Sequence, residues 1–75
     1  MAKPTLMQGS KGPDVKILQA ALNALPTEYA LLIVDGMFGP KTGARVREAQ
    51  AALGIVIDGV VGPVTWSRLD DALMS

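Results

Sequence analysis

The chain has 75 residues, and its seven lysine or arginine residues balance seven aspartate or glutamate residues, so its net charge is zero. Neutralising nucleic-acid phosphates requires clustered Lys and Arg, so nucleic-acid binding is not expected. The absence of cysteine and histidine excludes disulfides, thiol nucleophiles, Cys/His zinc sites and imidazole bases. No apolar run reaches the ~18 residues that a membrane-spanning helix needs, so no membrane span is predicted.

The first predicted helix covers about residues 13–25. Pro13 suits the first helical position, where its missing N–H would be unpaired anyway. An apolar stripe follows at spacings of three and four residues, which places it on one helix face. The stripe consists of Val15, Leu18, Leu22 and Leu25. Pro26 ends the helix, because the residue before a proline avoids the α conformation.

Two further helices are predicted over about residues 40–53 and 63–74, each opened by a proline. The residues of the second helix that are expected to face inward are Thr42, Val46, Ala49 and Leu53. Those expected on its outer faces are Lys41, Arg45, Arg47 and Glu48. Gly54 ends this helix, since glycine readily takes the left-handed conformation. The inward residues of the third helix are expected to be Trp66, Leu69 and Leu73.

None of these short helices buries its apolar stripe alone, so packing of all three around one shared core is the expected solution. The predicted fold class is therefore all-α, a small three-helix bundle with long loops. It is expected to form a single domain over residues 1–75, with a core over about 5–73. Short apolar segments at residues 31–34 and 55–57 could pair weakly, so at most a minimal strand pair is expected.

The pattern Asp-Gly-x-x-Gly-Pro-x-Thr occurs twice, at residues 35–42 and 58–65, with an offset of 23 residues. Repetition at such a period indicates that one local structural device is used twice. The aspartate of each copy is expected to accept hydrogen bonds from turn amides, the glycine after it to take positive φ, and the threonine to bond the local backbone. The repeat is thus explained first as a turn that starts the next helix.

Further residues accompany the repeat in a fixed order and spacing. They are residues 8–15 (QGSKGPDV), Leu18, Gln19, Leu22, residues 34–42 (VDGMFGPKT), Val46, Gln50, residues 58–66 (DGVVGPVTW) and Leu69. Together they closely resemble the peptidoglycan-binding domain family, the small three-helix modules attached to bacterial cell-wall hydrolases. The resemblance covers about residues 5–73. The chain departs from the family at Ala49, where phenylalanine is usual, and at residues 26–31, where a longer loop replaces a tight turn.

The resemblance implies non-catalytic binding of bacterial cell-wall peptidoglycan, through its peptide stem or its glycan, which would target an attached or associated wall-acting protein. The contact surface is expected to be a shallow groove between the first two helices and the two Asp-Gly turns. The candidate ligand-binding residues are Gln19, Asp35, Gly36, Gln50, Asp58, Gly59, Tyr29 and Trp66. Structural roles are the alternative: each glutamine as a satisfied polar bridge from helix to loop, Trp66 as a core anchor, and Tyr29 as a cap over the first helix end.

No catalytic residue is predicted, and the chain by itself is not expected to be an enzyme. Asp70 and Asp71 are adjacent, but neighbouring helical positions point about 100° apart, so these carboxylates do not flank a cleft as in a glycosidase. No cofactor and no metal are expected.

The expected partners are peptidoglycan and a separate wall hydrolase or a phage or secretion component, with the chain itself a monomer. No apolar segment of a secretory signal is visible near the N-terminus. We therefore expect action at the bacterial cell wall or periplasm, after synthesis in the cytoplasm and delivery by another route or after removal of a leader. The alternatives are a protein–protein adaptor of a phage or secretion apparatus with the same fold, and a fragment of a larger cell-wall hydrolase.

Overall fold

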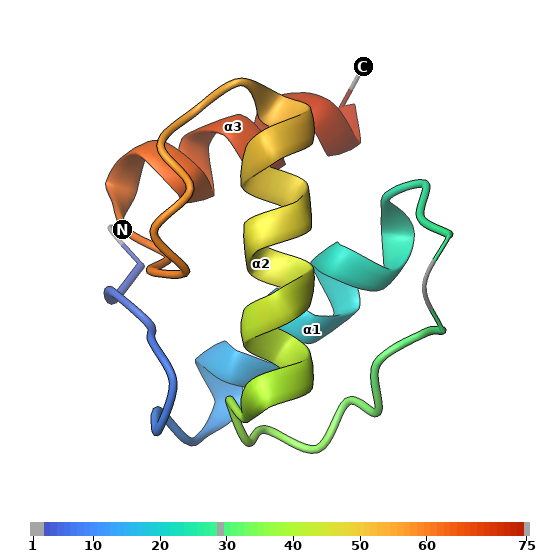
Figure 1. Cartoon of the computed structure of the whole chain (residues 1–75). Helices are drawn as coiled ribbons and strands as arrows, with labels where there is room; N and C mark the ends of the chain where they lie inside the picture. The colour runs from blue at the N-terminus through green and yellow to red at the C-terminus, as the bar shows by residue number, and fades with distance from the viewer. Residues whose placement is uncertain (1–2, 29, 75) are drawn as a thin grey trace.

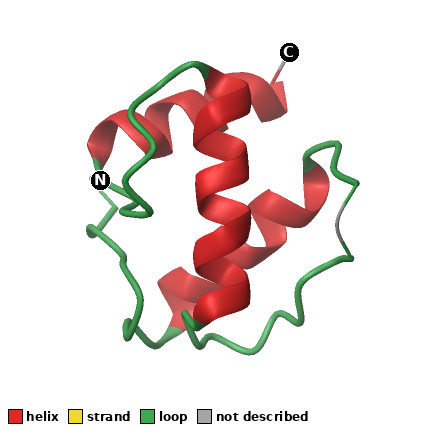
Figure 2. Ribbon diagram, viewed as in Figure 1, coloured by secondary structure: helices red, strands yellow, loops and turns green. Residues whose placement is uncertain are grey.

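The computed structural model describes residues 3–28 and 30–74, which form three helices joined by loops (Figures 1 and 2). These are α1 (Pro13–Ala24), α2 (Pro40–Leu53) and α3 (Pro63–Met74). Each helix contacts both of the others. The prediction of an all-α three-helix bundle is confirmed, and no helix among the described residues is long and apolar enough to cross a membrane.

The helix ends follow from the residues that flank them. Pro40 and Pro63 stand at the first positions of α2 and α3, as predicted, and Gly54 ends α2 in the left-handed conformation (φ 71°, ψ 29°). α1 ends one residue earlier than expected, at Ala24. Leu25 is extended (φ −83°, ψ 149°) because the proline that follows it disfavours the α conformation.

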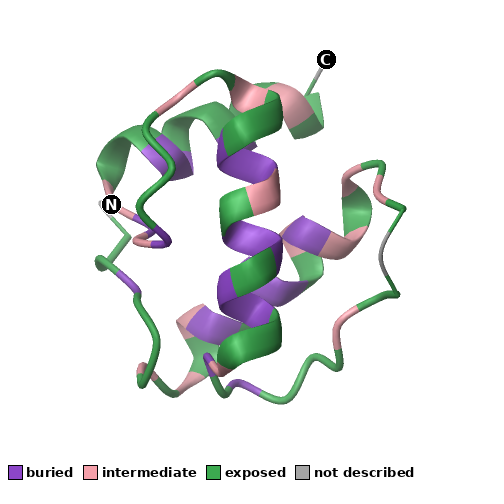
Figure 3. Ribbon diagram, viewed as in Figure 1, coloured by how far each residue is buried: buried purple, intermediate pink, exposed green. Residues whose placement is uncertain are grey.

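The core lies between the three helices, and the helix faces that meet there are buried (Figure 3). Its buried apolar residues are Leu6, Val15, Leu18, Leu22, Phe38, Val46, Ala49, Val61, Trp66 and Leu69. Phe38 thus supplies an aromatic ring to a core in which Ala49 stands at the usual phenylalanine position. The expectation that Leu73 faces inward is wrong, because its side chain is 40% exposed near the end of α3.

The N-terminal segment joins the two turns to the helices. Leu6 and Val61 exchange both backbone hydrogen bonds, at 3.0 and 2.8 Å, and a second antiparallel bridge pairs Lys11 with Met37. The segments 31–34 and 55–57 form no bridge with each other among the described residues. Instead of the expected strand pair between these two segments, the N-terminal segment pairs with both turns. The indole Nε1 of Trp66 donates to the Pro4 carbonyl at 2.9 Å, which fixes the start of the N-terminal segment on the core.

Two leucines separate core packing from surface exposure. Replacing the fully buried Leu18 by alanine leaves a cavity in a small core, and we expect the free energy of unfolding to fall by about 3 kcal/mol. The same change at Leu73 should cost less than ~1 kcal/mol. Urea denaturation followed by circular dichroism measures both values. Equal losses in the two variants would contradict the placement of Leu73 outside the core.

Candidate functional site

A buried glutamine side chain holds the first Asp-Gly turn against α1. Gln19 is 1% exposed, and its Nε2 donates to Asp35 Oδ1 at 3.0 Å and to the Met37 carbonyl at 3.0 Å. The same amide reaches Thr42 Oγ1 at 3.2 Å. Gln19 Oε1 accepts from the backbone N–H of Gly36 at 2.9 Å. One side chain therefore bonds a carboxylate, a carbonyl and the N–H of the buried Gly36 in the same turn.

The second turn repeats this arrangement almost bond for bond. Gln50, also 1% exposed, donates through Nε2 to Asp58 Oδ1 at 2.9 Å, to the Val60 carbonyl at 3.0 Å and to Thr65 Oγ1 at 3.3 Å. Its Oε1 accepts from the backbone N–H of Gly59 at 3.0 Å. The two threonines were expected to bond the local backbone, and Thr65 Oγ1 donates to the Val60 carbonyl at 3.5 Å. Each threonine also accepts a hydrogen bond from the glutamine of the preceding helix.

Each aspartate also accepts a hydrogen bond from a backbone N–H two residues ahead, at 2.9 Å in both turns. That hydrogen bond, followed by the one from Gln19, holds the pKa of Asp35 below its ordinary value of 3.8, although the carboxylate is exposed. The pKa of Asp58 is lowered in the same way by the Val60 N–H and Gln50. Gly36 and Gly59 take φ of 78° and 72°, which confirms the positive φ predicted for both.

The two copies differ in the connection between glutamine and aspartate. This connection spans 16 residues in the first copy and 8 in the second. The longer connection is tied to the helices at two points. Asn23 bonds the backbone of Leu32 in both directions, at 2.9 and 2.8 Å, and Thr27 Oγ1 donates to the Glu48 carboxylate at 3.0 Å. The extension is therefore held in place by side chains of α1 and α2.

Arg45 is buried (3% exposed), so its predicted place on the outer face of α2 is wrong. Its guanidinium pairs with Glu48 and donates to the Leu22 carbonyl near the end of α1. Burial of this charge is compatible with folding because both of these partners are in place. The signal was in the helical spacing, since position 45 lies three residues after Thr42 and four before Ala49, on the inward face.

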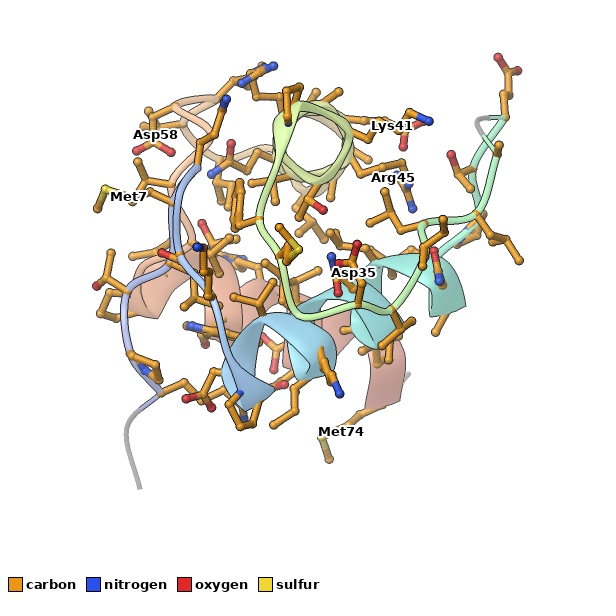
Figure 4. All side chains as sticks on the ribbon, turned by 90° about the horizontal axis from the view of Figure 1, so that it is seen from below. Met7, Asp35, Lys41, Arg45, Asp58 and Met74 are labelled. Carbon is orange, nitrogen blue, oxygen red and sulfur yellow. The ribbon has the colours of Figure 1, made fainter. Side chains whose placement is uncertain are left out.

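The longer connection forms one wall of a pocket of about 710 Å³, which we call the loop pocket. Its other wall is the start of α2, with Lys41, Thr42, Ala44 and Arg45. Residues 30–33 contribute mostly aliphatic side chains, of which Leu31 and Ile33 are largely exposed. Figure 4 shows Asp35, Lys41 and Arg45 gathered on one side of α2.

A second, smaller depression of about 280 Å³ lies beside the second turn, and we call it the Arg47 hollow. Its lining residues are Met7, Gln8, Phe38, Gly43, Arg47, Asp58, Gly59 and Val60. In Figure 4, Met7 and Asp58 lie on the opposite side of α2 from Lys41 and Arg45. The two turns therefore line different concave surfaces, whereas the sequence suggested one groove for both.

The predicted site residues do not come together at one place. Gln19 and Asp35 line the loop pocket, while Asp58 and Gly59 line the Arg47 hollow. Gln50 and Trp66 are buried and line neither concave surface. Gly36 is buried in its turn and Tyr29 lies outside the described residues. Sequence reasoning overlooked Gly43 and gave no functional role to Arg47. Among residues 3–28 and 30–74, no group of three acidic side chains could hold a metal ion.

The hydrogen bonds of Gln50 should contribute strongly to stability. Replacing Gln50 by leucine keeps the approximate side-chain volume but removes the acceptor of the Gly59 N–H and the amide that donates to Asp58 and to the Val60 carbonyl. We expect the free energy of unfolding to fall by about 2–4 kcal/mol. The exposed Gln8 provides the matched control, and Gln8→Leu should change stability by less than ~0.5 kcal/mol. A Gln50→Leu protein as stable as its control in urea titrations would contradict the structural role of the glutamine.

The two turn carboxylates predict loss of stability in acid. Because the pKa of Asp35 and Asp58 is lowered in the folded protein, the unfolded chain takes up these protons at higher pH than the folded chain. The stabilisation is complete above about pH 5 and is lost progressively as the pH falls through the unfolded and then the folded pKa.

The double variant Asp35→Asn/Asp58→Asn should therefore show a flatter decline of unfolding free energy below about pH 4. Urea titrations at a series of pH values measure this decline. The control variant Asp70→Asn/Asp71→Asn, at two exposed positions of α3, should decline as the wild type does. An unchanged decline in the turn variant would show that these carboxylates are not linked to folding.

Comparison with known proteins places this architecture in a family. The family model of the peptidoglycan binding domain matches residues 11–69. The zinc D-Ala-D-Ala carboxypeptidase of Streptomyces albus G is 43% identical over 51 residues, which are 68% of this chain and 20% of that enzyme. The Burkholderia AP3 phage endolysin is 41% identical with a TM-score of 0.82, over 91% of this chain and 25% of the endolysin.

The N-terminal domain of SleB matches this chain with 30% identity and a TM-score of 0.86, over 97% of both chains. The match thus covers nearly all of the SleB N-terminal domain. It covers only about a fifth of the carboxypeptidase and a quarter of the endolysin. The match of the family model over most of the sequence, together with these relatives, shows that the chain belongs to the peptidoglycan-binding domain family.

Proposed function

We propose that this non-catalytic module binds bacterial peptidoglycan at the loop pocket. The observation that carries the proposal is the combination of family membership with a pocket of about 710 Å³ at the longer of the two repeat connections. Pockets of a few hundred to about 1,000 Å³, mainly apolar with a few polar groups, are typical binding sites for small ligands and ligand segments.

The chemistry of the loop pocket suits a short peptide that carries small aliphatic side chains and a carboxylate. Leu31, Leu32 and Ile33 offer an aliphatic wall, and Lys41 supplies a cation at the opposite rim. The start of α2 adds to this polarity, since its N-cap Gly39 has no side-chain capping hydrogen bond and the helix dipole favours anions at that end. The peptide stem of peptidoglycan, with its methyl groups and carboxylates, therefore matches the pocket better than an uncharged sugar does.

The predicted contact residues divide their roles under this proposal. Asp35, exposed at the pocket, is assigned to contact with amide donors of the ligand. Gln19 and Gln50 act as positioning residues, because their amides already bond the turns. Trp66 is assigned a structural role in the core, where its indole N–H donates to the Pro4 carbonyl. Contact through Asp58 and Gly59 belongs to the other side of α2.

Binding of modest strength would serve to concentrate a wall-acting protein at its substrate. Two of the relatives, a carboxypeptidase and a phage endolysin, are much longer than this chain. A module attached to or associated with such a protein raises its effective concentration at the wall without new chemistry. We therefore propose targeting at the bacterial cell wall as the role of the domain, with a phage or secretion adaptor of the same fold as the competing hypothesis.

Two exposed alanines of α2 allow a matched test. Ala44 lines the loop pocket, while Ala51, seven residues later on the same helix face, lines neither concave surface. Ala44→Trp should fill the pocket and weaken co-sedimentation with purified bacterial sacculi about tenfold or more, whereas Ala51→Trp should sediment as the wild type does.

Circular dichroism verifies that both variants are folded. Equal sedimentation of the two variants would remove the loop pocket from the proposal. A wild-type domain that stays wholly in the supernatant at every salt concentration would overturn peptidoglycan binding itself and favour the adaptor hypothesis.

A further inference from the structure

The Arg47 hollow presents two opposite charges that do not pair with each other. Arg47 and Asp58 both line it, yet the ion pair found among the described residues is the one between Arg45 and Glu48. No carboxylate oxygen of the described residues lies within 4.0 Å of the Arg47 guanidinium nitrogens. Asp58 accepts hydrogen bonds from the backbone N–H of Val60 in its own turn and from Gln50 of α2. A cation and an anion thus face one hollow with space between them.

Two glycines create the space in which the guanidinium lies. A Cβ atom on Gly59 would stand 3.1 Å from Arg47 Nη1 and 3.7 Å from its Cγ, so the arginine side chain runs directly over this residue. A Cβ atom on Gly43 would stand 3.6 Å from Arg47 Nη1, 3.6 Å from Phe38 and 3.8 Å from the Gln8 Oε1. The guanidinium therefore lies between two residues without side chains, beside an aromatic ring and a primary amide.

The charge arrangement selects the chemistry of a ligand. A guanidinium binds a carboxylate through two parallel hydrogen bonds, and a carboxylate such as Asp58 accepts from an ammonium group. A ligand with only a carboxylate meets repulsion from Asp58, and a ligand with only an ammonium meets repulsion from Arg47. A group with both charges close together satisfies both walls.

We propose that the Arg47 hollow binds a carbon atom that carries both an ammonium and a carboxylate group, with the carboxylate on Arg47 and the ammonium on Asp58. Gln8 supplies a further polar contact, and the side of the Phe38 ring supports the aliphatic part of the ligand. Such a group occurs at the free end of a diamino acid in a wall peptide. The biological source of the ligand rests on the proposed function, whereas the recognition chemistry rests on this hollow alone.

Titration of the ¹⁵N-labelled protein with 2,6-diaminopimelate tests the proposal without any cell-wall material. The comparison ligands are heptanedioate, which lacks the ammonium groups, and 1,5-diaminopentane, which lacks the carboxylates, all at the same ionic strength. We expect saturable amide shifts at Gly43, Arg47, Gly59 and Val60 with diaminopimelate, and about tenfold weaker binding of either comparison ligand.

The matched variants exchange one exposed arginine each. Arg47→Gln should weaken diaminopimelate binding about tenfold or more, because it removes the charged partner of the carboxylate. Arg68→Gln removes an exposed arginine of α3 that lines neither concave surface, and it should bind as the wild type does. The same amide spectra show whether each variant is folded.

Equal weakening in both arginine variants, or equal binding of all three ligands, would reduce the effect to general charge attraction and overturn the proposal. So would the absence of saturable shifts at these four residues. A protein that sediments with sacculi but shows no such titration refutes the hollow and leaves the proposed function standing. A protein that shows these shifts with diaminopimelate but does not sediment with sacculi refutes the proposed function and leaves binding at the Arg47 hollow standing.

Discussion

The arrangement of this small domain depends on one interaction, the hydrogen bonding of a buried glutamine amide to the Asp-Gly turn that follows its helix. The primary amide of Gln19 or Gln50 offers donors to a carboxylate and a carbonyl and an acceptor to a turn N–H. Burial of such a group is costly unless it is bonded, so the helix and the turn are fixed relative to each other. Each turn then leads directly into the helix that starts at Pro40 or Pro63.

α2 belongs to both copies of this device. Its first turns receive the hydrogen bond from Gln19 through Thr42, and its second half supplies Gln50 to the next turn. The same helix therefore separates the loop pocket from the Arg47 hollow (Figure 4). Repetition of one device has produced two different concave surfaces, because the connection is longer in one copy and an arginine lies across the glycine in the other.

The longer connection carries apolar side chains that stability alone does not explain. A chain of 75 residues needs most of its apolar side chains to build a core, yet Leu31 and Ile33 are largely exposed. Asn23 and Thr27 hold the backbone of this segment against α1 and α2. An exposed aliphatic wall on a segment that is fixed in this way is typical of a surface that contacts a ligand.

Local signals in the sequence were enough to predict the helices and the turns. Apolar spacing, prolines at helix starts, Gly54 and the glycines of positive φ all act within a few residues, and the structure confirms them. The structural interpretation of the repeat, of Gln19 and of Trp66 also agrees with the hydrogen bonds that these residues make. Ligand contact by the candidate residues stays a prediction.

Tertiary structure decided what local rules could not. Arg45 is buried because its guanidinium donates to the Leu22 carbonyl, 23 residues away, and pairs with the Glu48 carboxylate. Asp35 and Asp58 line separate surfaces, the loop pocket and the Arg47 hollow, whose residues Lys41 and Asp58 lie on opposite sides of α2. Helix periodicity and turn geometry are set by neighbouring residues, so the sequence by itself determined the elements and the family. The partners of buried polar groups and the position of a pocket depend on segments far apart in the chain, and only their packing determines them.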